Sequence, residues 1–230
     1  MQDLSYLEQQ LGVHFRNRDL LKQALVHRSY LNENPSFEIE HNERLEFLGD
    51  AVLELVVTEY LYQHFPNPEG ELTNWRASLV NSKMLATIAK GLKIEEFLYL
   101  SRGEAKDANS KARDYILANA MEAVIGALYL DQGYEPAKNM IEQKMIVELP
   151  HILENQLYVD PKSKFQEIAQ EKMGVTPNYQ LMNESGPDHD KHFEVGVYLG
   201  EELIASGIGS SKQEAQVSAA RAALDKKSWN

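Results

Sequence analysis

The sequence predicts an all-α N-terminal domain followed by a smaller α+β C-terminal domain with the order α-β-β-β-α. Three observations lead to this fold class. The chain has 230 residues, enough for two modest domains. Apolar residues recur at helical spacing through the first two-thirds, and after Pro150 short segments with period-two alternation follow. We expect domains of residues 1–157 and 158–230, with no long linker and no internal repeat.

The first domain should consist of helices separated by turn-forming stretches. The breaks fall in FPNPEGEL, KGLK and DQGYEP, where proline and glycine end or start helices. Residues 101–111, SRGEAKDANSK, are expected to form a polar loop. The expected helices cover residues 4–11, 19–30, 42–65, 72–90, 94–98, 112–131 and 135–149.

The second domain should begin with a short helix in DPKSKFQEIAQEKMG, ended by Gly174. Three strands are expected in PNYQLMNE, KHFEVGVYLG and EELIASGIG. In the second strand, the apolar residues from Phe193 to Leu199 alternate with period two. A last helix should follow GSSK and run to about Lys227.

Composition limits the class of protein. The apolar (43%) and charged (25%) fractions are ordinary for a globular chain, so a real core is expected. The chain has no cysteine, which excludes disulfides and thiolate metal sites. There is no secretion signal and no apolar stretch of about 18 residues, so we expect a cytoplasmic protein without a membrane partner. The net charge is −12, so any nucleic-acid surface must be a local patch.

The stretch ERLEFLGD places acidic residues in an apolar helix. Glu43, Glu46 and Asp50 are three and four positions apart and therefore share one face. Like charges at this spacing repel one another. The stripe is either a solvated face or a site for a hard divalent cation, which prefers oxygen ligands. One helix cannot surround an ion, so a second helix should contribute, and Asn119 and Glu122 share a face in ILANAMEAVIGALYLD.

Two stretches carry a family resemblance. NERLEFLGDAVLELV closely resembles the signature helix of ribonuclease III, and the tail with PKSKFQE, GPDHDKHFEV and GIGSSKQEA resembles the double-stranded-RNA-binding domain of bacterial members. The resemblance covers nearly the whole chain. It implies a homodimeric endoribonuclease that cuts double-stranded RNA with Mg²⁺, for which Mn²⁺ can substitute. It also implies 5′-phosphate and 3′-hydroxyl products, processing of rRNA and other RNA precursors, and no small-molecule cofactor.

The resemblance also implies roles for the acidic residues. Asp50 and Glu122 would be catalytic, with Asp50 holding metal-bound water. Glu43 and Glu69 would be supporting acids, the second reaching toward the partner subunit's site. The implied metal ligands are Glu46, Asn119 and Glu122.

Asn119 departs from the family pattern, because many members have aspartate there. An amide oxygen can still bind a hard cation, so we expect an active site with weaker Mg²⁺ binding. The alternative is a catalytically impaired protein of the same fold that binds double-stranded RNA without cutting it. A metal-dependent phosphatase of small molecules would not explain the C-terminal domain.

Phe47 and Gly49 point to close packing near the acids. In the family, an aromatic residue at the position of Phe47 inserts into a pocket on the partner, and the alternative is an ordinary core phenylalanine. A glycine inside a helix costs about 1 kcal/mol relative to alanine. Gly49 therefore indicates a close helix approach, which would fit a dimer interface.

The expected RNA contacts lie mainly in the second domain. Its first helix and the GPDHD loop would face minor grooves, and the last helix would direct its N-terminus at phosphates. Gln213 and Gln216 stand where the family helix often has lysines, so modest affinity and a shallow salt dependence are expected. The expected contacts are Gln166, Glu167, His189, Ser210, Ser211 and Lys212, with Arg76 from the first domain.

Overall fold

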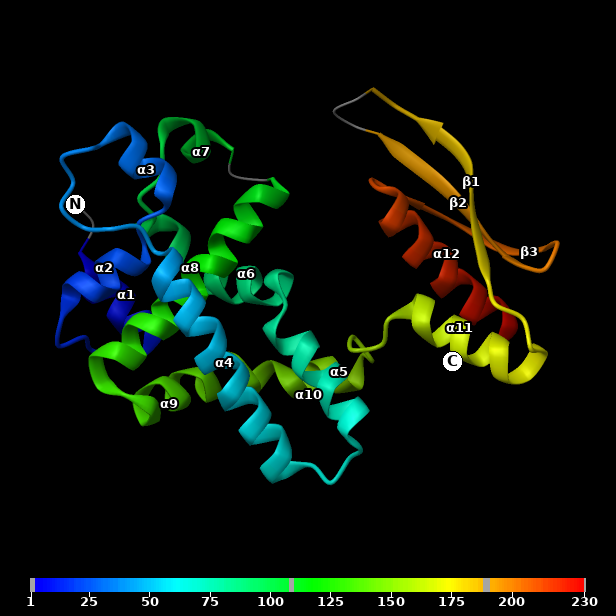
Figure 1. Ribbon diagram of the computed structural model, residues 1–230, viewed down its shortest axis with the longest axis horizontal. Coiled ribbons are helices and arrows are strands. Elements are labelled where there is room, and N and C mark those ends of the chain that lie inside the picture. The colour runs from blue at the N-terminus through cyan, green and yellow to red at the C-terminus, as the bar shows by residue number, and fades with distance from the viewer. Residues whose placement is uncertain (1–2, 108–109, 188–190, 230) are drawn as a thin grey trace. The chain divides into compact units, whose positions relative to one another are not determined.

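The chain forms two compact units, Met1–Tyr158 and Val159–Asn230, in a computed structural model that describes residues 3–107, 110–187 and 191–229 (Figure 1). In these described ranges, no helix is long and apolar enough to cross a membrane.

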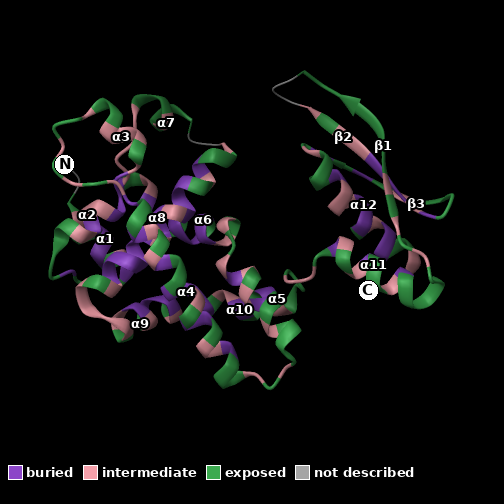
Figure 2. Ribbon diagram, viewed as in Figure 1, coloured by how far each residue is buried: buried purple, intermediate pink, exposed green. Residues whose placement is uncertain are grey.

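The first unit is built from helices, as predicted. Its two longest helices pack against each other, and the buried residues gather around them (Figure 2). The helices are α1 (Leu4–Leu11), α2 (Arg18–Ala24), α3 (Arg28–Glu33), α4 (Glu43–His64), α5 (Glu69–Val80), α6 (Ser82–Gly91), α7 (Arg102–Lys106), α8 (Lys111–Gln132), α9 (Tyr134–Lys144) and α10 (Leu149–Glu154), with 3-10 turns η1 (Ile94–Phe97) and η2 (Ile146–Glu148).

The start of α4 is fixed by the buried residue Asn42. Its backbone N–H donates to the carbonyl of Val26 at 2.9 Å, and its Nδ2 donates to the carbonyl of Ala24 at 3.2 Å. The start of α8 is capped by Ser110, whose Oγ accepts from the N–H of Arg113 at 3.2 Å. These bonds fix where the two central helices begin.

The prediction of a single helix over residues 19–30 is wrong, because helix α2 ends at Ala24 and a second helix, α3, begins at Arg28. Val26 instead forms a parallel β-bridge with Tyr99. His27 then caps α3, and its Nδ1 accepts from the N–H of Ser29 at 3.3 Å. A long-range backbone pairing and a side-chain cap therefore replace one turn of helix.

Three further expectations for the first unit are wrong. The helix expected at residues 135–149 ends at Lys144, and the 3-10 turn η2 and helix α10 follow it. The helix expected at residues 72–90 is interrupted at Asn81, which has extended backbone and caps α6 through the N–H of Met84 at 3.0 Å. The stretch 101–111, expected as loop, contains the short helix α7, capped by Ser101. A serine or asparagine whose own backbone is extended can cap the start of a helix with its side chain, as Asn81 and Ser101 do.

The second unit has the predicted order of helix, three strands and helix. Helix α11 (Pro161–Met173) and helix α12 (Lys212–Lys227) flank an antiparallel sheet in the order β1 (Asn178–Ser185), β2 (His192–Leu199), β3 (Glu202–Gly209). Helix α12 packs directly against β3. The two elements are so close that a Cβ at Gly207 on β3 would overlap the backbone of Ala219 on α12. The core contains Phe165, Ala169, Val197, Leu199, Ile204, Ala219, Ala220, Ala223 and Leu224.

Candidate active site

The candidate site is built where α4 and α8 touch through two glycines. A Cβ at Gly49 would overlap the carbonyl oxygen of Glu122, and a Cβ at Gly126 would overlap the carbonyl oxygen of Leu45. The close helix approach predicted from Gly49 therefore exists. It joins two helices of the same chain.

This contact brings the predicted acids of the two helices together. On α4, Glu46 lies about one turn before Gly49, and Asp50 directly follows Gly49. On α8, Asn119 and Glu122 precede Gly126 by two turns and one turn. The Asn119 amide hydrogen-bonds the Glu46 carboxylate, and the Glu122 carboxyl experiences the charges of Asp50 and Glu46.

The electrostatics of the site disfavour negative charge. Burial raises the pKa of the Glu122 carboxyl to about 7, and the nearby carboxylates of Asp50 and Glu46 add to the rise. Burial also raises the pKa of Glu46, as do the charges of Glu43 and Asp50, while the hydrogen bond from Asn119 opposes the shift. The site therefore holds carboxylates that a positive charge would stabilise.

The chain itself does not provide that positive charge. Within the described ranges, Glu46, Asp50 and Glu122 form no ion pair with lysine, arginine or histidine. Among the same residues, no three histidine, aspartate or glutamate side chains form a metal-holding group by themselves. A hard divalent cation fits this donor set only if the amide oxygen of Asn119 joins the carboxylates of Glu46 and Glu122.

Glu43 and Glu69 lie in different places. Glu43 is at the edge of the cluster, 3.6 Å from Nη1 of Arg28 and 3.8 Å from Nδ1 of His41. Glu69 begins α5, beyond the far end of α4, and roughly 20 Å of helix separates Asp50 from that end. Glu69 lines a separate pocket of about 430 Å³ with Tyr62 and Arg76. The structure thus does not bring Glu69 to the acidic cluster of its own chain.

Phe47 is exposed, which excludes the alternative of a core residue. It lies on α4 beside the acids with 82% of its surface exposed. Leu55 and Tyr62 follow at about two-turn intervals and are exposed too, so α4 has an apolar side that its own chain leaves uncovered.

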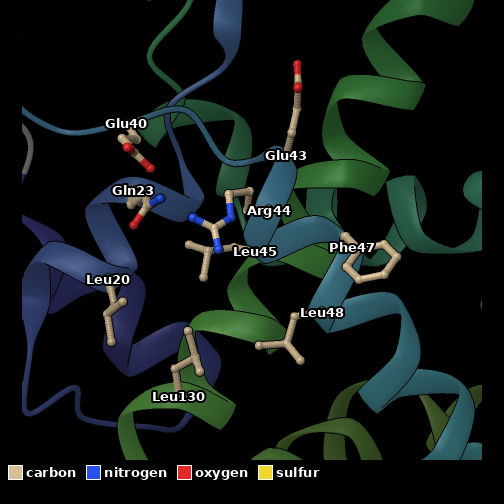
Figure 3. A pocket seen from close by; sticks show the side chains of 9 residues that line it. All are labelled: Leu20, Gln23, Glu40, Glu43, Arg44, Leu45, Phe47, Leu48 and Leu130. Atoms are coloured by element: carbon tan, nitrogen blue, oxygen red, sulfur yellow. The ribbon is translucent and has the colours of Figure 1, made fainter.

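A pocket of about 630 Å³ lies next to Phe47 (Figure 3). Its apolar wall comes from α2, α4 and α8, and Arg44 extends across it. The pocket is lined by Leu20, Gln23, Glu40, Glu43, Arg44, Leu45, Phe47, Leu48 and Leu130. The apolar wall and the exposed ring are thus neighbours on one surface.

The residues expected to contact RNA are mostly exposed. Gln166 and Glu167 project from α11. At α12, the Oγ of Ser211 accepts from the N–H of Glu214 at 3.2 Å, which caps the helix. His189 lies outside the described residues. Arg76 is engaged within its own unit, since its Nη1 donates to Oγ1 of Thr58 at 3.0 Å.

Ser210 and Lys212 have partners within the second unit. The N–H of Ser210 donates to the Glu214 carboxylate at 2.9 Å, and the ammonium of Lys212 lies 5.8 Å from the ring centre of Phe193. Part of the N-terminus of α12 is therefore engaged by an acid of its own helix.

Two functional features were missed from the sequence. Gly126 is as necessary as Gly49 for the helix contact, and its position seven residues after Asn119 was the available signal. The wall of the pocket beside Phe47 combines Leu20, Leu48 and Leu130, which are distant in sequence. No local pattern identifies such a surface.

Comparisons with known proteins agree with this geometry. The family model "Ribonuclease-III-like" matches residues 17–149, and the model "Double-stranded RNA binding motif" matches residues 161–227. "Ribonuclease 3" of Dehalococcoides mccartyi is 42% identical, with 97% of this chain and 94% of the relative covered. "Ribonuclease 3" of Nitratiruptor is 44% identical, covering 97% and 96%.

A solved structure resembles the first unit. The crystal structure of the nuclease domain of ribonuclease III from Campylobacter jejuni matches with a TM-score of 0.58 and 41% identity, covering 65% of this chain and 98% of that one. Both family models match in the order of the two units, and the relatives are similar over almost their full length. The chain therefore belongs to the ribonuclease III family.

Proposed function

We propose that the chain is an endoribonuclease that hydrolyses phosphodiester bonds of double-stranded RNA with a divalent metal ion, leaving 5′-phosphate and 3′-hydroxyl ends. One observation carries the proposal. The Gly49 and Gly126 contact gathers Glu46, Asp50, Asn119 and Glu122 into an acidic site without a cationic partner in the described residues, in a chain that also has a double-stranded-RNA-binding motif.

We propose a role for each residue of the site. Glu46, Asn119 and Glu122 would hold Mg²⁺ or Mn²⁺ through oxygen atoms. The bound ion would supply a Lewis acid and lower the pKa of its water. Asp50, exposed at the rim, would accept hydrogen bonds from that water and orient it. Glu122 must lose its proton to bind a cation, and its raised pKa makes this step dependent on pH near neutrality.

Dimerisation accounts for the uncovered side of α4. Phe47 of each subunit would insert into the apolar pocket that lies next to Phe47 on the other subunit. The same surface patch of both subunits would then form the interface, as in a two-fold symmetric dimer. The charge of Glu69 would then lie near the partner subunit's site, and Glu43 would stay at the edge of its own cluster. A solved structure of the ribonuclease III nuclease domain from Campylobacter jejuni is described as having a region involved in dimer formation. This similarity supports a dimer of the present chain.

The second unit would hold the duplex. Gln166 and Glu167 would contact one minor groove of the duplex, and His189 would contact the next minor groove. The phosphates between the two minor grooves would be bound by Ser210, Ser211 and Lys212. Arg76 would contact the backbone from the first unit. Substrates would include precursors of rRNA and other RNAs in the cytoplasm.

No contact among the described residues favours the alternative that the protein binds double-stranded RNA without cutting it. The case for it depended on Asn119. The side chain at this position reaches Glu46, and an amide oxygen is an acceptable ligand for Mg²⁺.

Cleavage of a long RNA duplex tests the proposal. Mg²⁺ and Mn²⁺ should each support cutting, whereas a chelator, single-stranded RNA and duplex DNA should give no products. Glu122→Gln should bind the duplex normally and cut it at least about 100-fold more slowly, because a metal ligand is lost. Duplex binding without cutting in either metal would reject the enzyme and favour the binding protein.

A further inference from the structure

Lys162 stands at the junction between the two helices of the second unit. It lies in the first turn of α11, and its Nζ donates to Oε1 of Gln216 on α12 at 2.7 Å. The ammonium also lies 5.1 Å from the ring centre of Tyr179, a favourable position for a cation. Two contacts from different elements therefore fix where this charge is held.

The N-terminal part of α12, which lies next to Lys162, has few positive charges of its own. Lys212 is the only lysine or arginine in the first two turns of this helix, and its ammonium lies over Phe193. Gln213 and Gln216 occupy neighbouring positions and carry no charge. Because Gln216 accepts from Lys162, α11 supplies a positive charge beside the N-terminal half of α12.

The charge of Lys162 is not neutralised by an acid. Among the described residues it forms no ion pair, whereas Lys191 pairs with Glu184 at 2.8 Å and Lys227 with Glu202 at 3.7 Å. An ammonium has three donors. The bond to Gln216 uses one, which leaves two for another acceptor.

Lys162 also lies on the side of α11 that is proposed to meet RNA. Gln166 follows it by four residues, so the two side chains are neighbours on the helix surface. A duplex that meets Gln166 in its minor groove presents phosphates along the groove edge.

We propose that Lys162 binds a phosphate of the RNA duplex and that Gln216 positions it. Lys162 thereby supplies a charge that α12 lacks at positions 213 and 216. The inference rests on the proposed binding of duplex RNA by the second unit, and it assigns a contact to a residue outside the expected set.

The test measures binding of the full chain to a synthetic RNA duplex of about 20 base pairs, longer than the about 16 that one such domain spans. A chelator prevents cutting, and salt is varied from about 50 to about 200 mM. Lys162→Met removes the charge and keeps an apolar stem against Tyr179. Lys172→Met is the matched control, because Lys172 is on the same helix and its ammonium lies over a ring as well, 5.6 Å from the centre of Trp229.

We expect Lys162→Met to weaken binding roughly three- to tenfold and to reduce the slope of log affinity against log salt by about one. Lys172→Met should change neither. Lys162→Arg should keep the slope, and Gln216→Ala should weaken binding while keeping most of the slope, since the charge remains.

An unchanged slope for Lys162→Met would overturn the inference, provided that melting curves show a folded protein. If this variant does not fold, Lys162→Gln, which can still hydrogen-bond Gln216, decides in the same way. Failure of the unsubstituted chain to bind the duplex would instead reject the proposed RNA binding. The two failures are therefore distinguishable.

Discussion

Asn119 determines how much negative charge the site holds. As an amide it donates a hydrogen bond to Glu46 and adds no charge to Asp50, Glu46 and Glu122. An aspartate there would provide a stronger ligand for a cation, but it would repel the other carboxylates when no cation is bound.

We therefore expect Asn119→Asp to bind Mg²⁺ roughly tenfold more tightly and to melt at a lower temperature in chelator. Melting curves recorded over a Mg²⁺ titration measure both effects, since a ligand that binds only the folded state raises its stability. Asn119→Ser, which also lacks the charge, is the control. Equal Mg²⁺ affinities for Asn119→Asp and the unsubstituted chain would contradict this account.

Glu122 should make the stability of the metal-free protein depend on pH. Its pKa is raised to about 7 in the folded chain from 4.5, so between these values the folded state holds a proton that the unfolded chain has released. The free energy of unfolding should then fall as pH rises through this window. Below the window both states are protonated, and above it the loss is complete.

Melting temperatures in chelator from about pH 5 to about pH 8 measure this dependence. Glu122→Gln should remove part of the decline, because the amide does not titrate. Added Mg²⁺ should stabilise the protein more at the alkaline end, where Glu122 is ready to bind it. Parallel profiles for Glu122→Gln and the unsubstituted chain would show that another group causes the decline.

At the scale of helices, the contact between α4 and α8 determines whether the site exists. Gly49→Ala places a methyl group on the carbonyl oxygen of Glu122, so the helices must separate. We expect a loss of about 3 kcal/mol in the free energy of unfolding, at the upper end of the cost of overpacking, together with weaker Mg²⁺ binding.

Gly91→Ala is the matched control for this substitution, because a Cβ there meets nothing within 4 Å. It should be neutral or stabilising by about 0.5 to 1 kcal/mol. Urea unfolding and Mg²⁺ titration of both variants provide the measurement. A Gly49→Ala protein as stable as Gly91→Ala would mean that the helix contact adapts easily.

Helix positions were easier to predict than helix breaks. The long helices α4 and α8 and the alternating strand β2 follow from local apolar spacing. The break after α2 depends on pairing between Val26 and Tyr99, residues that are distant in sequence. Local pattern cannot reveal such a pairing.

The site shows the same limit. The spacing of Glu43, Glu46 and Asp50 predicted the acidic face of α4, and Asn119 with Glu122 followed from the need for a second helix. The backbone contact at Gly126 and the hydrogen bond between Asn119 and Glu46 depend on how two helices meet. These details require the three-dimensional packing.

At the scale of the whole molecule, the apolar side of α4 carries the proposed dimer. Phe47, Leu55 and Tyr62 are large and exposed, and a monomer gains nothing from this arrangement. The pocket beside Phe47 offers an apolar wall of Leu20, Leu48 and Leu130. A second copy of the chain presents both features, so each ring could enter the other subunit's pocket around a two-fold axis.

Phe47→Ala should therefore weaken the dimer without destabilising the folded subunit. An exposed ring adds little to the core, whereas a buried aromatic anchor at an interface contributes about 2 to 4 kcal/mol, or roughly 30- to 1000-fold in the dissociation constant. Analytical ultracentrifugation over a concentration series should show a shift from dimer to monomer. Val147→Ala, which shortens another exposed apolar side chain, is the control. A dimer that Phe47→Ala leaves intact would place the interface on another surface, and α4 would then need a different partner.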